Sequence, residues 1–230
     1  MQKRKDGAWA VSSDVEAALV PAQVIATLRD FQAGISESQA AHIADYVRLL
    51  LRWNEKVSLT TITTPQEILT RHFGESLFGA RVAKIEAGRL LDVGSGAGFP
   101  ALPIAMFAAG IRGTLLEPNI KKAAFLAEAC RELGLVDRIS VVRARLEEFP
   151  APAHAFDFMT SRAVRVTGEF LAKCSEMLSE PGKLVLWLGH EDVVSVRQNR
   201  GWTWAEPTRI PGSERRFVLW GTPIKPEGST

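Results

Sequence analysis

The sequence predicts an α/β fold in which a seven-stranded, mostly parallel sheet follows an N-terminal helical extension. From Arg89 onward, short apolar runs alternate with stretches of helical periodicity, the pattern of a parallel sheet covered by helices. The length of 230 residues suits one such domain with an appended piece. We therefore divide the chain into the extension (1–85), in which residues 1–12 are expected to be frayed, the sheet domain (86–221) and a loose tail (222–230).

Two helices are expected in the extension. Residues 36–53 carry apolar side chains at helical spacing, and Ser36 with Gln39 matches a capping box at the start. Residues 64–67 form a second capping-box pattern with proline at the first helical position. This pattern predicts that another helix begins there and continues to Leu77.

The sheet domain is expected to contain five strands with helical crossovers, followed by a hairpin. The strands are placed at 89–93, 113–117, 139–143, 156–160 and 183–188, and the helices at 100–109, 119–133, 166–178 and 190–200. Residues 202–210 and 215–220 flank a Pro-Gly-Ser-Glu turn and form the hairpin. Five strands and this hairpin make seven.

Composition excludes several classes of protein. Hydrophobic residues make up 46% and charged residues 23%, as in folded soluble proteins, which excludes wholesale disorder. The 28 Lys and Arg against 26 Asp and Glu leave a net charge of +2, so only local basic patches could bind nucleic acid. The two cysteines form no CxxC pair, and no metal site is predicted. Without a signal peptide or a run of roughly 18 apolar residues, we expect a soluble, cytoplasmic protein with no membrane partner.

The strongest functional signal is the glycine-rich segment 94–100, which directly follows the first strand. Gly94, Gly96 and Gly98 allow a tight turn and a close approach of the backbone to a ligand at the carboxyl edge of the sheet. A dinucleotide fingerprint would need glycine at position 99, so the GxGxG spacing argues against a pyrophosphate cofactor.

An acidic residue ends the second strand. Glu117 can accept both hydroxyls of an adenosine ribose through charge-assisted hydrogen bonds, worth roughly 1.5–3 kcal/mol each. A glycine triplet alone is equally typical of a plain strand-to-helix turn. Together with Glu117, it predicts a nucleoside site.

Residues 91–100 resemble motif I of S-adenosylmethionine-dependent methyltransferases of the seven-stranded class I type. More narrowly, the chain resembles the RsmG (GidB) family of small-subunit rRNA guanine-N7 methyltransferases, over roughly residues 40–190. The further segments that carry the resemblance are Arg52–Thr60, Arg71-His72, Glu75–Leu77, Ala144–Phe149 and Phe156–Val164. The chain departs from the family at Leu188, where a lysine is usual.

The resemblance implies S-adenosyl-L-methionine as the cofactor and 16S rRNA or the small ribosomal subunit as the partner, with methyl transfer to N7 of guanine 527. It implies cofactor contacts from Gly94, Phe99, Leu146, Glu147 and Arg162. From its place after the fourth strand, Arg162 could meet the cofactor carboxylate or an RNA phosphate, or form only a surface ion pair.

Guanine N7 already carries a free lone pair, so its methylation needs no general base, and positioning alone can supply catalysis. We therefore predict no catalytic residue, and Arg162 is the one candidate for such a role. The candidates for RNA binding are Arg71, His72, Arg143, Arg145 and Arg165. His72 is equally well explained as a half-buried histidine. Cys130 and Cys174 lie in expected helices and are predicted to be core thiols rather than nucleophiles.

Two other functions are compatible with a nucleoside site on this sheet. One is a nicotinamide-dependent oxidoreductase, against which the GxGxG spacing argues. The other is a non-catalytic nucleoside-binding module in ribosome assembly, since a fold does not imply an activity. The retained loop glycines and Glu117 argue against a decayed site. We expect no DNA partner.

Overall fold

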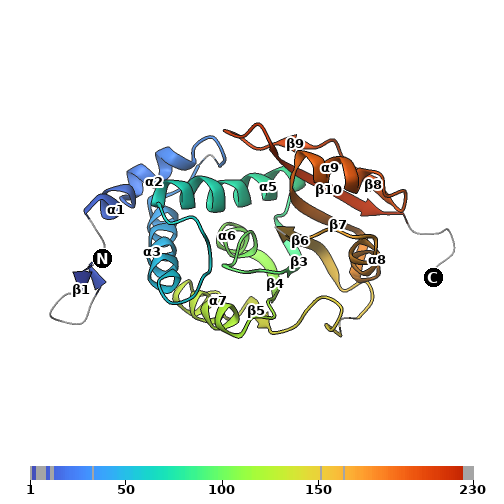
Figure 1. Cartoon of the computed structure of the whole chain (residues 1–230), viewed down its shortest axis with the longest axis horizontal. Helices are drawn as coiled ribbons and strands as arrows, with labels where there is room; N and C mark the ends of the chain where they lie inside the picture. The colour runs from blue at the N-terminus through green and yellow to red at the C-terminus, as the bar shows by residue number, and fades with distance from the viewer. Residues whose placement is uncertain are drawn as a thin grey trace.

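The computed structural model describes residues 2–3, 9–10, 13–32, 34–150, 152–162 and 164–224. An eight-stranded sheet with helices on both faces forms its centre (Figure 1). Most residues of the segments expected to be frayed (1–12) or loose (222–230) lie outside the described residues. Of those described, β1 (Gln2–Lys3) pairs with β2 (Trp9–Ala10), and the last strand extends to Pro223 because Thr222 and Pro223 pair with another strand.

The extension is helical, as predicted. Its helices are α1 (Ser13–Ala18), α2 (Pro21–Leu28), α3 (Glu37–Asn54), α4 (Pro65–Glu67), the π-helix η1 (Ile68–Gly74) and α5 (Glu75–Ala83). The predicted capping box at α3 is confirmed: the amide of Gln39 donates to Ser36 Oγ at 3.2 Å, and the amide of Ser36 donates to Gln39 Oε1 at 3.0 Å.

The second helix of the extension differs from the prediction in its middle and at its end. It begins at Pro65, and Thr64 Oγ1 accepts from the amide of Glu67, as the capping pattern predicts. It then widens into the π-helix η1 and continues through α5 to Ala83, six residues beyond the expected end at Leu77. π-Turns are rare in helices and are frequent at functional sites.

The sheet has the predicted seven strands in one continuous path and a short eighth. The strands are β3 (Ala87–Val93), β4 (Gly110–Leu116), β5 (Ile139–Val142), β6 (Phe156–Arg162), β7 (Leu178–Gly189), β8 (Trp202–Trp204), β9 (Thr208–Arg209) and β10 (Arg216–Pro223). Their order is β5-β4-β3-β6-β7-β10-β8, and β9 also pairs with β10. The five strands β3 to β7 are parallel, whereas β10 runs antiparallel to β7. One arm of the predicted hairpin is thus divided into β8 and β9.

Helices cover both faces of the sheet (Figure 1). They are α6 (Ala101–Phe107) and α7 (Ile120–Glu132) on the face shared with the extension, and α8 (Gly168–Met177) and α9 (His190–Arg197) on the other face. Alternate strand residues supply the two cores: Leu90 packs with the extension, and Leu91 packs on the side of α8 and α9. No helix in the described part of the chain is long and apolar enough to span a membrane.

The two cysteines are core residues, as predicted. Cys130 lies in α7 and Cys174 in α8, and both are buried. Burial raises the pKa of Cys130 to about 11 and that of Cys174 further. Neither thiol therefore ionises readily at neutral pH, and neither lies at a strand end.

Candidate functional site

The glycine loop folds tightly over the carboxyl ends of β3 and β4. Gly94, Gly96 and Gly98 have φ angles of 72°, 55° and 80°, in the left-handed region that favours glycine. The amides of Gly94 and Ser95 both donate to the carbonyl of Leu116 at 3.0 Å. These bonds bind the loop to the end of β4, next to the predicted ribose acceptor.

A tyrosine of the N-terminal extension forms a hydrogen bond with the backbone of the glycine loop. The hydroxyl of Tyr46, the only tyrosine of the chain, donates to the carbonyl of Ala97 at 2.6 Å from helix α3. A Cβ added at Gly98 would contact this hydroxyl and would lie 2.9 Å from Cγ of Leu102. Gly98 therefore needs to be glycine both for its φ angle and for space. Sequence reasoning assigned no role to Tyr46.

Phe99 lies in a stack of rings beneath the loop. Its ring is sandwiched between those of Tyr46 and His72, with centroid distances of 5.5 and 4.6 Å, and Phe73 meets it edge-on. Phe99 is buried, with 7% of the residue exposed. A cofactor contact from this residue would thus come from its backbone, while its ring joins the loop to α3 and η1.

Glu117 connects the loop to the segment after β4. Its Oε2 accepts from the amide of Gly96 at 2.8 Å, and its Oε1 accepts from the amide of Asn119 at 2.9 Å. Each carboxylate oxygen can accept a second hydrogen bond. The two backbone amides thus hold the carboxylate in place, and it keeps the capacity to accept the two hydroxyls of a ribose.

An apolar cavity of about 220 Å³ opens beside Gly94. It is lined by Val93, Gly94, Leu116, Pro118, Ala144, Arg145, Leu146, Glu147, Val164 and Phe170. Leu146 is buried, whereas Glu147 is exposed. The cavity adjoins Glu117 through its neighbours Leu116 and Pro118. The structure thus brings the loop, the acid and the predicted Leu146-Glu147 pair to one place, in an arrangement that suits an adenosine.

Asp92 lies directly beneath the loop and was not assigned from the sequence. Its Oδ1 accepts from the hydroxyl of Thr160 at 2.7 Å, and its buried Oδ2 has no hydrogen-bond partner among the described residues. Burial raises the pKa of Asp92 to about 6, while the hydrogen bond from Thr160 acts in the opposite direction. The sequence signal that could have identified Asp92 is its position as a charged residue within the apolar run of a strand.

Arg162 ends β6 and forms a buried ion pair, rather than the surface pair considered above. Its Nη2 lies 3.2 Å from Oε2 of Glu75, whose Oε1 lies 2.8 Å from Nε of Arg216. Glu75 is 2% exposed. Arg71 is close enough to interact electrostatically with both Glu75 and Arg162. The sequence predicted neither Glu75 nor Arg216 as a site residue.

The predicted RNA-binding residues fall into two groups. Arg71 and His72 lie in η1, close to Arg162. Arg143, Arg145 and Arg165 are exposed and follow the ends of β5 and β6. All five thus lie on the side of the sheet where its parallel strands end.

His72 is neutral at physiological pH. Its Nε2 is 2.9 Å from Thr60 Oγ1, and its Nδ1 has no hydrogen-bond partner among the described residues. Burial, together with the positive charges of Arg162 and Arg71, lowers the pKa of His72 to about 3. Any contact of His72 with RNA would therefore involve a neutral imidazole.

This depressed pKa predicts a pH-dependent stability. The unfolded chain binds a proton at His72 below about pH 6.5 and the folded chain does not, so His72 makes the fold less stable as the pH falls. Between pH 7.5 and 5, wild type is expected to lose about 2 kcal/mol more unfolding free energy than His72→Gln. Urea unfolding of both proteins at the two pH values measures this difference. Parallel losses would show that His72 is protonated in the fold.

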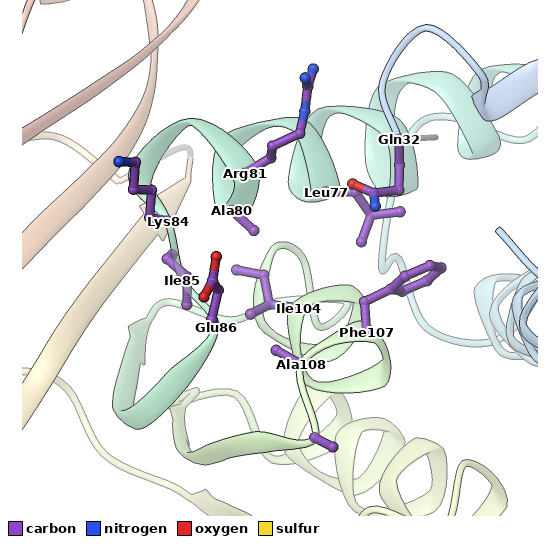
Figure 2. A pocket seen from close by; sticks show the side chains of 11 residues that line it. Gln32, Leu77, Ala80, Arg81, Lys84, Ile85, Glu86, Ile104, Phe107 and Ala108 are labelled. Atoms are coloured by element: carbon purple, nitrogen blue, oxygen red, sulfur yellow. The ribbon is translucent and has the colours of Figure 1, made fainter. Parts of the chain in front are cut away.

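A second cavity lies away from this site. It has a volume of about 330 Å³ and lies between α5 and α6, where Ile104 and Phe107 face Leu77 and Ala80 (Figure 2). Its other lining residues include Glu86 and Ala109, which directly precede β3 and β4. The cavity is therefore at the amino ends of the strands, whereas ligands of open α/β sheets bind at the carboxyl ends.

Comparison with known proteins agrees with this geometry. Residues 39–205 match the family model described as rRNA small subunit methyltransferase G, GidB. The ribosomal RNA small subunit methyltransferase G of Xanthomonas euvesicatoria pv. vesicatoria (strain 85-10) is 36% identical over 212 residues, which cover 89% of this chain and 97% of that protein. The protein of the same name from Stenotrophomonas maltophilia (strain R551-3) is 36% identical over 208 residues, covering 86% and 95%.

Solved structures show the same fold at low sequence identity. The [4+2]-cyclase SpnF matches with a TM-score of 0.61 and 16% identity over 82% of this chain and 97% of its own. A SAM-dependent methyltransferase from Aquifex aeolicus matches with a TM-score of 0.54 and 16% identity, over 64% and 89%. The shared fold, the loop with its acidic partner and the match over most of the chain lead to one conclusion: this chain belongs to the rRNA small subunit methyltransferase G (RsmG, GidB) family.

Proposed function

We propose that this protein transfers a methyl group from S-adenosyl-L-methionine to N7 of a guanine in 16S rRNA, at the family position 527. The observation that carries the proposal is the joint placement of the glycine loop, Glu117 and the apolar cavity at the carboxyl edge of the sheet. Family membership and the names of the relatives support the rRNA substrate. A protein that modifies ribosomal RNA works where ribosomes are assembled, so we place it in the cytoplasm.

The residues of the site fit the proposed cofactor. The loop glycines form a cradle that side chains would fill, since a Cβ at Gly94 would lie 2.8 Å from Val164. Glu117 would accept the ribose hydroxyls, and Leu146 would pack against the adenine beside Glu147. When bound, the cofactor supplies a methyl group on a positively charged sulfur. Arg162, at the end of β6, would lie on the side of the site that faces the substrate.

The proposed methyl transfer requires no acid or base catalysis by side chains. Guanine N7 is unprotonated at neutral pH and presents its lone pair at the edge of the base. The chain therefore needs no general base, and no pair of a nucleophile and a base is required. Its task is to orient the two reactants and exclude water, an effect worth roughly 7–11 kcal/mol in well-oriented reactions. Arg71, His72, Arg143, Arg145 and Arg165 would hold the RNA at this edge.

A labelling experiment tests the proposal. The protein is incubated with small ribosomal subunits that lack the modification and with cofactor carrying an isotope-labelled methyl group. We expect label to enter 16S rRNA at one guanine, in a form that cleaves under conditions specific for 7-methylguanine. Calorimetry should show cofactor binding and no binding of NADH. Cofactor binding without label transfer would favour the non-catalytic assembly module, and NADH binding would favour the oxidoreductase.

A further inference from the structure

Three arginines and one glutamate meet at the carboxyl edge of the parallel strands in a group that we call the edge cluster: Arg71, Arg162, Arg216 and Glu75. They come from η1, β6, β10 and α5. Glu75 contacts Arg162 at 3.2 Å and Arg216 at 2.8 Å. The proposed function gives no role to Glu75 or Arg216.

The edge cluster has more positive charge than its own carboxylate can balance. Arg71 forms no ion pair with any described residue, and the buried atoms Arg71 Nε and Arg162 Nη1 find no hydrogen-bond partner in the described part of the chain. Burial of unpaired guanidinium donors is costly unless an anion meets them. The cluster therefore lacks a negatively charged group that a ligand can supply.

The edge cluster is open to solvent on one side. The exposed fraction of the side chain rises from 2% at Glu75 to 17% at Arg162 and 36% at Arg216. An anion can therefore approach from the side of Arg216 while Glu75 stays buried behind the two guanidinium groups.

The edge cluster also lies on the opposite side of β3 from Glu117. Glu117 follows β4 on one side of β3, whereas Arg162 and Arg216 belong to β6 and β10 on the other side. Neighbouring strands are about 4.8 Å apart, and β10 is three strands from β3, so Arg216 lies roughly 14 Å along the edge from the loop. The Arg216 end of the cluster is therefore farther from the nucleoside pocket than Arg162 and suits a group of the substrate better than the cofactor.

We propose that the edge cluster binds a backbone phosphate of the RNA next to the target guanine, and that Glu75 is a positioning residue that holds Arg162 and Arg216 in place for it. This inference rests on the proposed function. Planar guanidinium groups bind phosphate oxygens through paired hydrogen bonds, which suits a phosphodiester. The backbone of Glu75 is itself fixed, because Nε1 of Trp187 donates to its carbonyl at 2.7 Å.

A matched pair of variants tests the phosphate site. Arg216→Gln removes a cluster arginine, and Arg215→Gln removes the same charge at its exposed neighbour, which has no ion pair among the described residues. With small ribosomal subunits as substrate, Arg216→Gln is expected to raise KM about tenfold. The slope of log affinity for 16S rRNA against log salt should fall by about 0.7–0.9, the contribution of one phosphate. Arg215→Gln should change KM less than twofold.

A second variant tests the positioning role. Glu75→Gln keeps the size of the side chain and removes its charge, so the cluster gains net positive charge but loses the group that orders Arg162 and Arg216. Turnover is expected to fall about tenfold, while the salt-dependent affinity for RNA stays equal or increases. A merely structural defect would lower RNA affinity and thermal stability together. If Glu75→Gln does not fold, the comparison of Arg216→Gln with Arg215→Gln tests the proposal by itself.

Calorimetry with S-adenosylmethionine separates the two anions that could fill the cluster. All three variants are expected to bind the cofactor within twofold of wild type. A tenfold loss of cofactor affinity in Arg216→Gln would assign the cluster to the carboxylate of the cofactor and overturn the proposal, as would equal behaviour of Arg216→Gln and Arg215→Gln. Inactive wild type would instead contradict the proposed function, so the two failures are distinguishable.

Discussion

Replacing Gly98 by alanine is expected to lower the affinity for S-adenosylmethionine on the order of a hundredfold, about 2.7 kcal/mol, and to destabilise the fold. The new methyl group would contact the Tyr46 hydroxyl and Leu102, at a residue whose φ of 80° is unfavourable for alanine. Left-handed strain costs roughly 1–3 kcal/mol, and overpacking costs a similar amount. Relief of the contact would displace the loop from Tyr46.

A glycine outside the site provides the control for Gly98. Gly134 also has a positive φ, 64°, but a Cβ there would meet nothing within 4 Å. Gly134→Ala should therefore lower the free energy of unfolding by about 1 kcal/mol through strain alone and leave cofactor affinity unchanged. Calorimetry and urea unfolding of both variants make the comparison. Wild-type cofactor affinity in Gly98→Ala would show that the loop does not depend on its contact with the extension.

Replacing Glu117 by alanine is expected to weaken cofactor binding by on the order of a hundredfold or more. Two charge-assisted hydrogen bonds to the ribose would be lost, at roughly 1.5–3 kcal/mol each. The cofactor-free protein should also lose stability, because the amides of Gly96 and Asn119 would lose their acceptor. A fully buried amide without a partner costs about 1–3 kcal/mol, and these two amides are only partly buried, so the loss should lie near or below the lower figure.

Glu132→Gln is a suitable control for Glu117, because this glutamate is exposed at the end of α7. It should leave both cofactor affinity and stability near their wild-type values. If Glu117→Ala binds S-adenosylmethionine within twofold of wild type, the carboxylate does not contact the ribose. A loss of stability alone would then assign Glu117 only to the support of the loop.

Much of the fold could be predicted because its signals are local. The apolar runs of β3 to β7, the Ser36 cap of α3 and the glycines of the loop each depend on residues that are close together in the sequence. The π-helix η1 left no comparable signal: its residues have ordinary helical periodicity, and Pro65 marks only the start. Its wider turn precedes α5, whose Glu75 forms the ion pairs with Arg162 and Arg216.

The site was predicted in part for the same reason. Gly94, Glu117 and Leu146 follow three neighbouring strands, and the carboxyl ends of parallel strands meet at one edge, so strand order alone brings them together. No such rule predicts the positions of Tyr46 and Arg216. Tyr46 lies in helix α3, 51 residues before the loop residue Ala97 that it contacts. Arg216 contacts Glu75 from an antiparallel strand near the end of the chain.

The amino-acid sequence by itself determined the class of sheet, the glycine loop and the family of this protein, because strand alternation, turn glycines and motif spacing act over short distances. Only the tertiary structure decided that the extension supports the loop through Tyr46, and that Glu75 gathers arginines from β6 and β10. Hydrogen bonds and ion pairs between distant segments depend on how the elements pack, and a single Tyr, Glu or Arg carries no mark of its eventual partner.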